Sequence, residues 1–243
     1  MTADPDARFA TTRWTRVVAA RGDSTLAGDA LGSLCEAYYS PVEAFIRARV
    51  GDAEAARDLT QEFFARVLRG GAFDGAEPTR GRFRSFLLGA VKHFLADTRA
   101  TARASKRGGG APAVSLDAGT DTSPGLDPPD PHALVEDAVF DQQWAISVLD
   151  RALKTLESEF KTSGKAEHFA VLKLWLTGFS PVSRTEAATS IGLNENAFAV
   201  AIHRLRKRFR EIVKTDIAQT VIGAEEQQAE LRHLIAALAS DGR

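Results

Sequence analysis

The segment between residues 105 and 133 constrains this chain most, because it cannot fold into a packed element. It holds three consecutive glycines at 108–110, five prolines and four aspartates. Proline removes a helix hydrogen-bond donor, glycine costs backbone entropy, and the segment offers little apolar surface to bury. The sequence therefore predicts a flexible acidic linker over 105–133 with a folded body on each side.

Charge and cysteine content narrow the class of protein. The 31 Lys and Arg residues nearly cancel the 32 Asp and Glu residues, so nucleic-acid binding would depend on where the charge lies. The single cysteine, Cys35, excludes an internal disulfide and a cysteine-based zinc site, and it favours a reducing compartment. The first residues do not resemble a signal peptide, and no apolar run approaches the ~20 residues that span a bilayer. We expect a cytoplasmic protein with no cofactor.

The residues before the linker follow a helical pattern. The first apolar stripe recurs at intervals of three and four residues, which is the spacing of one helix face: Leu31, Leu34, Cys35 and Tyr38. Ser40–Glu43 has the form of a capping box with Pro41 at the first helical position, which predicts that a new helix starts there. Further stripes lie in 59–68 and 83–95, and β-branched residues are sparse. Residues 1–104 are therefore predicted to form a compact helical bundle.

The residues after the linker predict a second all-α body. Periodic apolar stretches predict helices at 134–160 and 166–176. A capping box at Ser183–Glu186 opens a short helix, Gly192 ends it, and Asn194 caps the helix that follows. A short helix, a tight glycine turn and a longer helix make a helix-turn-helix.

The second domain is predicted to span 134–222, with a C-terminal helical extension over 223–243. The extension carries one apolar stripe: Leu231, Leu234, Ile235 and Leu238. We expect this helix to pack back on the protein, with docking of a partner as the alternative.

The helix after Asn194 is the first nucleic-acid candidate. Its later turns carry five cations: Arg204, Arg206, Lys207, Arg208 and Arg210. In a helix-turn-helix, the start of the second helix enters the major groove while cations bind phosphates. A solvated basic face on an ordinary bundle helix is the alternative, but the turn sequence upstream favours DNA binding.

A second basic stretch, from Arg80 to Arg107, is interleaved with Phe83, Phe86 and Phe94. Aromatic rings stack on unpaired bases and cations follow the phosphates, a combination that suits single-stranded nucleic acid. Phenylalanines at helical spacing are more often core residues, and Phe86 is expected to be mainly core.

These motifs resemble those of a known family, the bacterial RNA polymerase sigma factors. The match rests on the signature of the second conserved region, on a promoter-melting and −10-reading helix, and on a −35-reading helix-turn-helix: Asp58–Phe64, Arg82–Leu87 with Asp97 and Arg99, Thr185–Leu193 and His203–Arg206. Because only these two domains occur, the chain resembles the extracytoplasmic-function (ECF) group, in a subgroup extended at both ends.

The resemblance implies a promoter-specificity subunit and not an enzyme. Such a subunit binds core RNA polymerase at the beta-prime clamp coiled coil and the beta flap. It reads the −35 element as duplex DNA, captures the −10 element as single strand and assists promoter melting. An anti-sigma protein or a Ser/Thr kinase is a candidate regulatory partner, and no membrane is involved.

The resemblance also implies roles for individual residues. The core-polymerase contacts are Asp58, Gln61 and Glu62. The −10 contacts are Arg84, Lys92, His93, Arg99 and Arg103. The −35 contacts are Asn194, Asn196, Ala199, Val200, His203, Arg204, Arg206 and Lys207.

The chain departs from the family pattern on both DNA-reading elements. His93 stands where the family usually has an asparagine that helps to hold an extruded base, so base preference there differs. Ala199 and Val200 replace commoner polar residues, which predicts −35 reading through methyl contacts and DNA shape.

The third departure precedes Asp58, where Ala55 and Arg57 replace two acidic residues that are typical of the family. An arginine facing a basic polymerase surface weakens complementarity. One hypothesis is that phosphorylation of Thr60 supplies the missing negative charge. The alternative is that Asp58 and Glu62 suffice.

Two other functions compete with the sigma-factor interpretation. A stand-alone helix-turn-helix DNA-binding transcription regulator leaves Asp58–Phe64 unexplained. An enzyme acting on nucleic acid needs a catalytic site, and the sequence offers no paired carboxylates with a metal-binding histidine, no phosphate loop and no Cys/His arrangement.

Overall fold

The computed structural model describes residues 25–69, 82–106, 131–176, 182–221 and 223–239. Every regular element among them is a helix, which confirms the all-α prediction. In chain order they are α2 (Thr25–Val50), α3 (Ala53–Leu68), α4 (Phe83–Lys106), α5 (Pro131–Thr162), α6 (Ala166–Leu172), the 3₁₀ turn η2 (Lys173–Trp175), α7 (Arg184–Ser190), α8 (Glu195–Ala218) and α9 (Ala224–Ala239). The predicted N-terminal extension and most of the predicted linker lie outside the described residues.

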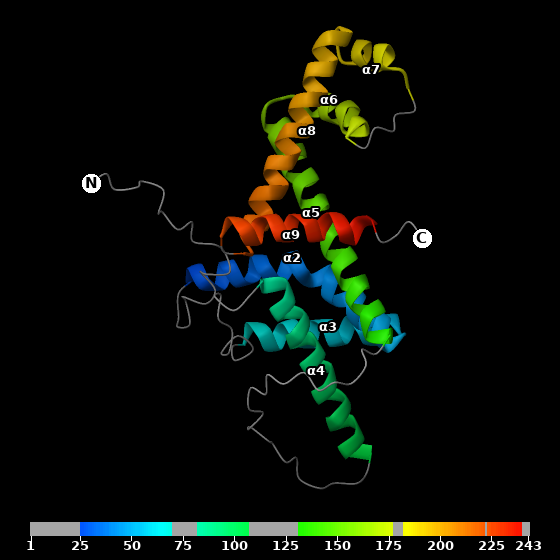
Figure 1. Cartoon of the computed structure of the whole chain (residues 1–243), viewed down its shortest axis with the longest axis vertical. Coiled ribbons are helices and arrows are strands. Elements are labelled where there is room, and N and C mark those ends of the chain that lie inside the picture. The colour runs from blue at the N-terminus through cyan, green and yellow to red at the C-terminus, as the bar shows by residue number, and fades with distance from the viewer. Residues whose placement is uncertain (1–24, 70–81, 107–130, 177–181, 222, 240–243) are drawn as a thin grey trace, which may run out of the picture.

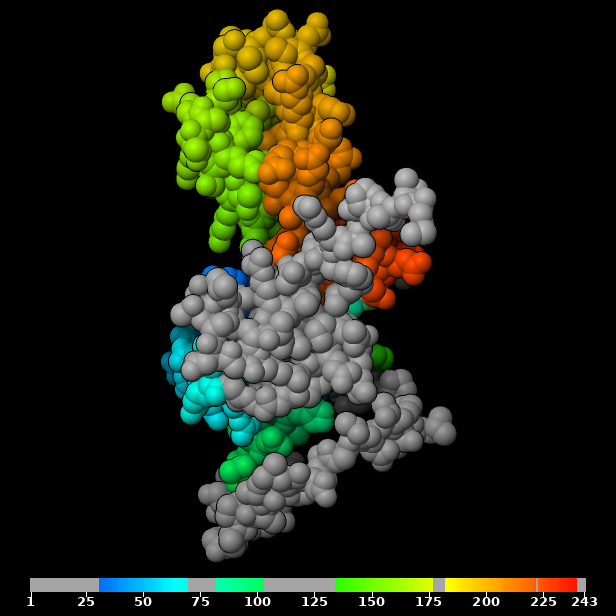
Figure 2. All heavy atoms as spheres, turned by 90° about the vertical axis from the view of Figure 1, so that its left-hand side faces the viewer, coloured from blue at the N-terminus to red at the C-terminus, as the bar shows by residue number. Residues whose placement is uncertain are grey.

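The helices form two bodies stacked along the long axis of the molecule (Figure 1). The first body contains α2, α3 and α4. The second contains α6, α7 and the first half of α8, and Figure 2 shows it as a separate lobe coloured light green to orange. α5 and α8 run side by side from one body to the other, and α9 lies across them beside α2.

Two hydrophobic clusters correspond to the two bodies. Phe45, Phe63 and Phe94 of the first body share the larger cluster with residues of α5, α8 and α9. The smaller cluster joins the end of α5 to the helix-turn-helix: Leu156, Phe169, Leu172, Ala187, Ala188, Phe198, Ile202 and Leu205. α5 and α8 therefore contribute to both cores.

The packing differs from the predicted division at residue 134. The α5 residues Phe140, Trp144 and Val148 are buried in the core of the first body, as is Val213 of α8. The linker is therefore not the only connection between the bodies, because two continuous helices also cross from one to the other. α9 packs back on the protein, as predicted, and buries Leu234 in the same core.

The predicted helix start at Ser40 is wrong, because α2 runs without a break from Thr25 to Val50 with Pro41 inside it. Proline has no backbone N–H, so it cannot donate to the carbonyl four residues earlier. That carbonyl belongs to Ala37, and Arg151 of α5 supplies the missing donor, with Nη1 3.0 Å from the Ala37 oxygen. A tertiary contact thus compensates for the proline.

Arg151 also binds α8. Its Nε and Nη2 lie 3.1 and 2.7 Å from Oδ2 of Asp216. One half-buried guanidinium therefore connects α2, α5 and α8 at the point where the bodies meet. None of the described helices is long and apolar enough to cross a membrane.

Replacing Arg151 tests this junction. We expect Arg151→Met to lower the free energy of unfolding by about 2 kcal/mol, because it leaves the buried carbonyl of Ala37 without a donor. In a Pro41→Ala background the same change should cost about 1 kcal/mol less, because the introduced alanine restores a backbone N–H to the helix. Urea denaturation followed by circular dichroism measures both values.

The control is Arg47→Met, which removes an exposed arginine whose only ion pair with a described residue is to Glu43 in its own helix. We expect it to change stability by less than about 0.5 kcal/mol. Equal costs of Arg151→Met in the two backgrounds would show that Arg151 does not compensate for the donor that Pro41 lacks.

Candidate nucleic-acid interface

The helix-turn-helix has the local structure that its sequence predicts. Ser183 accepts from the backbone N–H of Glu186, and the Glu186 carboxylate accepts from the backbone N–H of Ser183, which completes a capping box. Gly192 adopts φ of 70°, in the left-handed region that glycine reaches without steric cost. Asn194 caps α8 by accepting from Ala197 at 2.8 Å. Short-range signals therefore fix the angle between α7 and α8.

Two further contacts hold α7 in place. The Thr185 hydroxyl donates to the carboxylate of Glu195 at the start of α8. The guanidinium of Arg184 lies 5.9 Å from the ring centroid of Trp175. The buried Phe198 anchors the other side of α8, with its ring centroid 5.5 Å from that of Trp175.

Half of the predicted −35 contacts lie on one exposed face of α8. Asn196, Val200, His203 and Lys207 recur at intervals of four, three and four residues, so they share a face at about 100° per residue. All four are exposed, whereas the buried residues of this half of α8 lie on the opposite side: Phe198, Ile202 and Leu205. Ala199 and Arg204 flank the exposed face and are exposed as well.

Val200 is the unusual member of this face, because an apolar side chain remains 49% exposed. The resemblance to a −35-reading helix predicts that side chains at this position reach base edges. A methyl-bearing surface at this position fits contact with the C5-methyl group of thymine.

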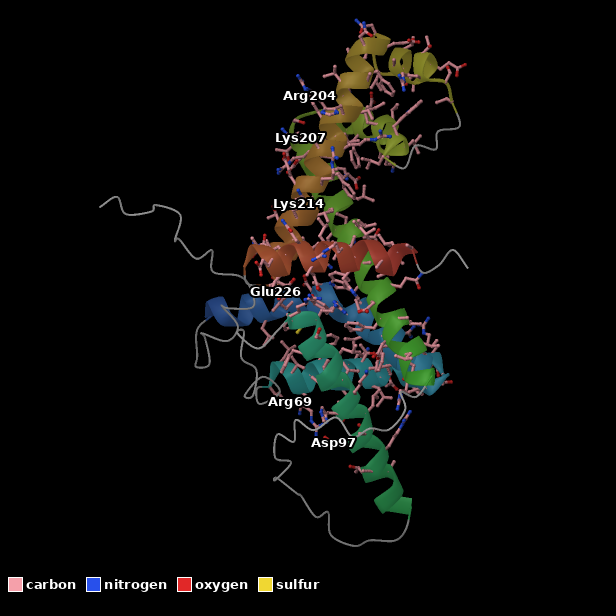
Figure 3. The ribbon with its side chains drawn as sticks, in the orientation of Figure 1. Arg69, Asp97, Arg204, Lys207, Lys214 and Glu226 are labelled. Carbon is pink, nitrogen blue, oxygen red and sulfur yellow. The ribbon has the colours of Figure 1, made fainter. Side chains whose placement is uncertain are left out.

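The cations of α8 divide into free and bound groups. Arg204, Lys207 and Lys214 form no ion pair with a described residue, and Figure 3 shows them in a row along the helix. Arg208 is bound, with Nε and Nη2 3.0 and 2.5 Å from the carboxylate of Glu159. The free row gives α8 a cationic edge beside its exposed face.

Arg206, predicted as a −35 contact, has a structural partner. Its Nε and Nη2 lie 3.2 and 2.6 Å from the carbonyl oxygen of Trp175. Trp175 ends η2, so this arginine ties α8 to the preceding helix pair. The prediction of a simple DNA contact did not anticipate that role.

Arg84, predicted as a −10 contact, is buried at the start of α4 with a relative exposure of 6%, so in this structure its guanidinium is covered. Its Nε donates to Glu230 of α9 at 2.9 Å, and its Nη1 pairs with Asp141 of α5. The guanidinium also lies 5.1 Å from the ring centroid of Trp144. Side chains from two other helices, α5 and α9, therefore surround this one charge.

The electrostatics of this cluster favour the charged form of Arg84. Burial disfavours the charged guanidinium of Arg84, but the hydrogen bond and charge of Glu230, with Asp141, outweigh it and raise the pKa of Arg84. Burial, and then the negative charge of Glu230, raise the pKa of the nearby Tyr38 well above its usual range. Tyr38 is consequently a neutral phenol.

The remaining −10 candidates lie on two sides of α4. Lys92 faces α5 and pairs with Asp137 at 2.7 Å. Arg99 is exposed and donates to the carbonyl of Arg49 at 3.5 Å. The side chain of Arg103 lies outside the described residues.

His93 projects to the other side of α4, into a groove of about 480 Å³. Phe63, Phe86 and Phe94 line the same groove. Phe86 is half-buried there, in keeping with its expected core role. Phe63 and Phe94 are buried in the core, so the half-buried Phe86 and the exposed His93 are the rings that a ligand in this groove could contact.

The predicted polymerase contacts share the exposed side of α3. Asp58, Gln61 and Glu62 are all exposed and lie within about one helical turn of one another. No described residue forms an ion pair with Asp58 or Glu62, so both carboxylates are open to a basic partner.

The Thr60 hypothesis is wrong for the folded domain. Thr60 has no exposed surface, and its hydroxyl donates to the carbonyl of Ala56 at 2.7 Å. Its neighbours on this side of α3 are the core residues Phe63 and Phe64. A kinase could not reach the hydroxyl, and a phosphate would have no room.

Sequence reasoning missed the acids that bind Arg84. Glu230, Leu234 and Ala237 recur at intervals of four and three residues, and all three are buried. An acid on the apolar side of an amphipathic helix needs a buried cation. The acidic residue at this apolar position was therefore the feature of the sequence that could have revealed the buried cluster. Among the described residues, no cluster of His, Cys, Asp or Glu side chains could hold a metal ion.

Comparison with known families adds one match. Residues 34–104 match the family model of sigma-70 region 2, over less than a third of the chain. The matched stretch contains most of α2, all of α3 and nearly all of α4. This supports a sigma-70 family factor that binds RNA polymerase and takes part in promoter recognition during transcription initiation. No curated protein and no solved structure matches the chain.

Replacing Arg84 tests whether it is part of the fold. We expect Arg84→Met to lower the free energy of unfolding by about 3–5 kcal/mol, because it leaves Glu230 buried without its main cation. Arg84→Met with Glu230→Leu should cost less than Arg84→Met alone, since an apolar pair replaces a buried ion pair. Urea denaturation followed by circular dichroism measures the difference.

The control for this experiment is Arg99→Met, which lies on the same helix but is exposed. We expect a change below about 0.5 kcal/mol. If Arg84→Met were equally mild, the buried cluster would not hold α4, α5 and α9 together.

Proposed function

We propose that the protein is an alternative sigma factor of the ECF group, extended at both ends. The observation that carries the proposal is the exposed face of α8, which lies opposite the core of a helix-turn-helix in the same chain as a sigma-70 region 2 match. In this proposal, region 2 binds polymerase and the −10 element, and residues 134–222 bind the −35 element.

α3 makes the proposed contact with core polymerase. Asp58, Gln61 and Glu62 present two carboxylates and an amide to the basic beta-prime clamp coiled coil. Arg57 is exposed on the same helix and reduces this complementarity. The second body binds the beta flap, which completes the attachment of both DNA-reading elements.

α8 makes the proposed contact with the −35 element. Asn194, Asn196 and Ala199 lie at its start, where a recognition helix enters the major groove. Val200 and His203 follow on the exposed face and read base edges. Arg204 and Lys207 bind the flanking phosphates, because neither is engaged by a described acid.

α4 makes the proposed contact with the −10 element as single strand. The groove beside His93 receives an extruded base against the half-buried ring of Phe86. Arg99, and Arg103 one turn later, follow the phosphates. Lys92 joins them if its exposed pair with Asp137 exchanges for a phosphate.

Run-off transcription with purified core polymerase tests the proposal. The templates are fragments upstream of the protein's own gene and of its neighbours. We expect specific transcripts only when the protein is present, and their start sites locate the −35 and −10 elements. Tight binding to duplex DNA without polymerase, together with no transcript, would instead support a stand-alone helix-turn-helix regulator.

The free cations of α8 give a second test. We expect Lys207→Gln to reduce the salt dependence of promoter binding by the holoenzyme, lowering the slope of log K against log[salt] by about 0.9. Arg208→Gln is the matched control, since Glu159 already binds Arg208. Filter binding at salt concentrations from about 50 to about 200 mM measures both slopes. An equal loss of slope in the two variants would argue against the assigned face.

A further inference from the structure

We propose that α9 competes with promoter DNA for Arg82 and Arg84, so that the C-terminal extension holds the −10-binding helix in an inhibited state. This inference rests on the proposed function, because it takes α4 as the helix that binds the −10 strand. It assigns a regulatory role to the extension, and it identifies the two carboxylates that carry it out.

The first observation is that α9 occupies the arginines at the start of α4. Glu230 lies 2.9 Å from Nε of Arg84 and 3.2 Å from Nη1 of Arg82. Glu226, one turn earlier, lies 3.0 Å from Nε of Arg82. Figure 3 shows Glu226 at the end of α9 that reaches the upper end of α4.

The second point is that Glu226 and Glu230 bind the two arginines in the way that phosphate groups would. Carboxylates and phosphates bind guanidinium groups through the same paired N–H donors. Two carboxylates one helical turn apart therefore fill positions that backbone phosphates of a single strand would take. The strand and α9 cannot occupy Arg82 and Arg84 together.

The third observation concerns which acids can leave. Asp137 and Asp141 belong to α5, whose Phe140, Trp144 and Val148 are buried in the core of the first body. Those two acids remain in place when DNA binds. Glu226 and Glu230 belong to a 16-residue helix at the end of the described chain, which follows Gly223 with a φ of 90°.

The ion pairs add specificity more than stability to the docking of α9. Removing a carboxylate and a guanidinium from water costs about as much as their attraction returns. Apolar contacts through Leu234 and Ala237 supply most of the docking free energy. The acids determine that α9 docks on the arginines. Because they add little net stability, an added polyanion can shift the equilibrium between docked and undocked α9.

A binding experiment with the full chain tests this competition. The probe is a fluorescein-labelled single strand, an oligo(dT) dodecamer, titrated by anisotropy without polymerase. The variant is Glu226→Gln with Glu230→Gln, which keeps the side-chain shapes and removes both charges. We expect about tenfold tighter binding, the factor that one further charge-assisted contact supplies.

Salt dependence distinguishes freed arginines from a general change in net charge. Release of Arg82 should steepen the slope of log K against log[salt] by about 0.7, because Asp141 stays paired with Arg84. The matched control is Glu225→Gln with Asp150→Asn, which also removes two negative charges. Both residues are exposed and neither pairs with a described cation. Equal slopes in the variant and the control would overturn the proposal.

Hydrogen–deuterium exchange on the unaltered protein keeps the test independent of how the variant folds. Saturating oligo(dT) should increase the exchange of α9 amides, because the strand displaces α9 from α4. Unchanged α9 exchange with the strand bound, or no binding of the strand by either protein at low salt, would overturn the proposal. Because no polymerase is present, a failed transcription assay would leave this result standing.

Discussion

The burial of α5 in two cores is the constraint on which the rest of the structure depends. Phe140 and Trp144 are almost completely buried beside α2, whereas Leu156, about three turns later, is buried against α6 and α8. An α-helix is stiff over this length, so the first body and the helix-turn-helix body keep a fixed relation along it. Arg151 lies between these two apolar stretches and satisfies the carbonyl that Pro41 leaves open. The junction is therefore held by packing and by a directional hydrogen bond at the same place.

Which basic residues of this protein are open to nucleic acid depends on the partners that each residue already has, and not on how many basic residues the sequence contains. The sequence contains two basic stretches, but in the structure several of their arginines are already engaged. Arg84 and Arg208 bind acids from other helices, and Arg206 binds a backbone carbonyl. Arg204 and Lys207 remain open on the face of α8 that points away from the core. A cluster of basic residues in a sequence thus overstates the surface that nucleic acid can reach.

Local signals predicted local structure well. Ser183, Gly192 and Asn194 act within four residues of themselves, so the helix-turn-helix boundaries could be read directly. The all-α class and the packing of α9 also followed from apolar periodicity. The capping box at Ser40 failed because Arg151, far along the chain, makes Pro41 tolerable inside α2.

Most of the errors at the candidate site have a similar origin. Arg84 was predicted to face DNA because its acidic partner Glu230 is 146 residues away in the sequence. Thr60 was treated as accessible, although Ala56, Phe63 and Val67 place it on the buried side of α3. Its own hydroxyl bond to Ala56 explains how a polar side chain is accommodated there. Short polar residues inside an apolar stripe are therefore better read as core than as modification sites.

Residues of α5 and α9 complete the core of the first body, and this has a consequence for how the chain folds during synthesis. A ribosome produces the chain from its N-terminus at about 5–20 residues per second, and domains usually fold as they emerge. Here, α2 to α4 emerge first, but the residues that complete their core lie in α5, at the end of α8 and in α9. The core of the first body can therefore be completed only after α5, the end of α8 and α9 have also emerged. The apolar faces of α2, α3 and α4 remain partly uncovered while those later helices are made.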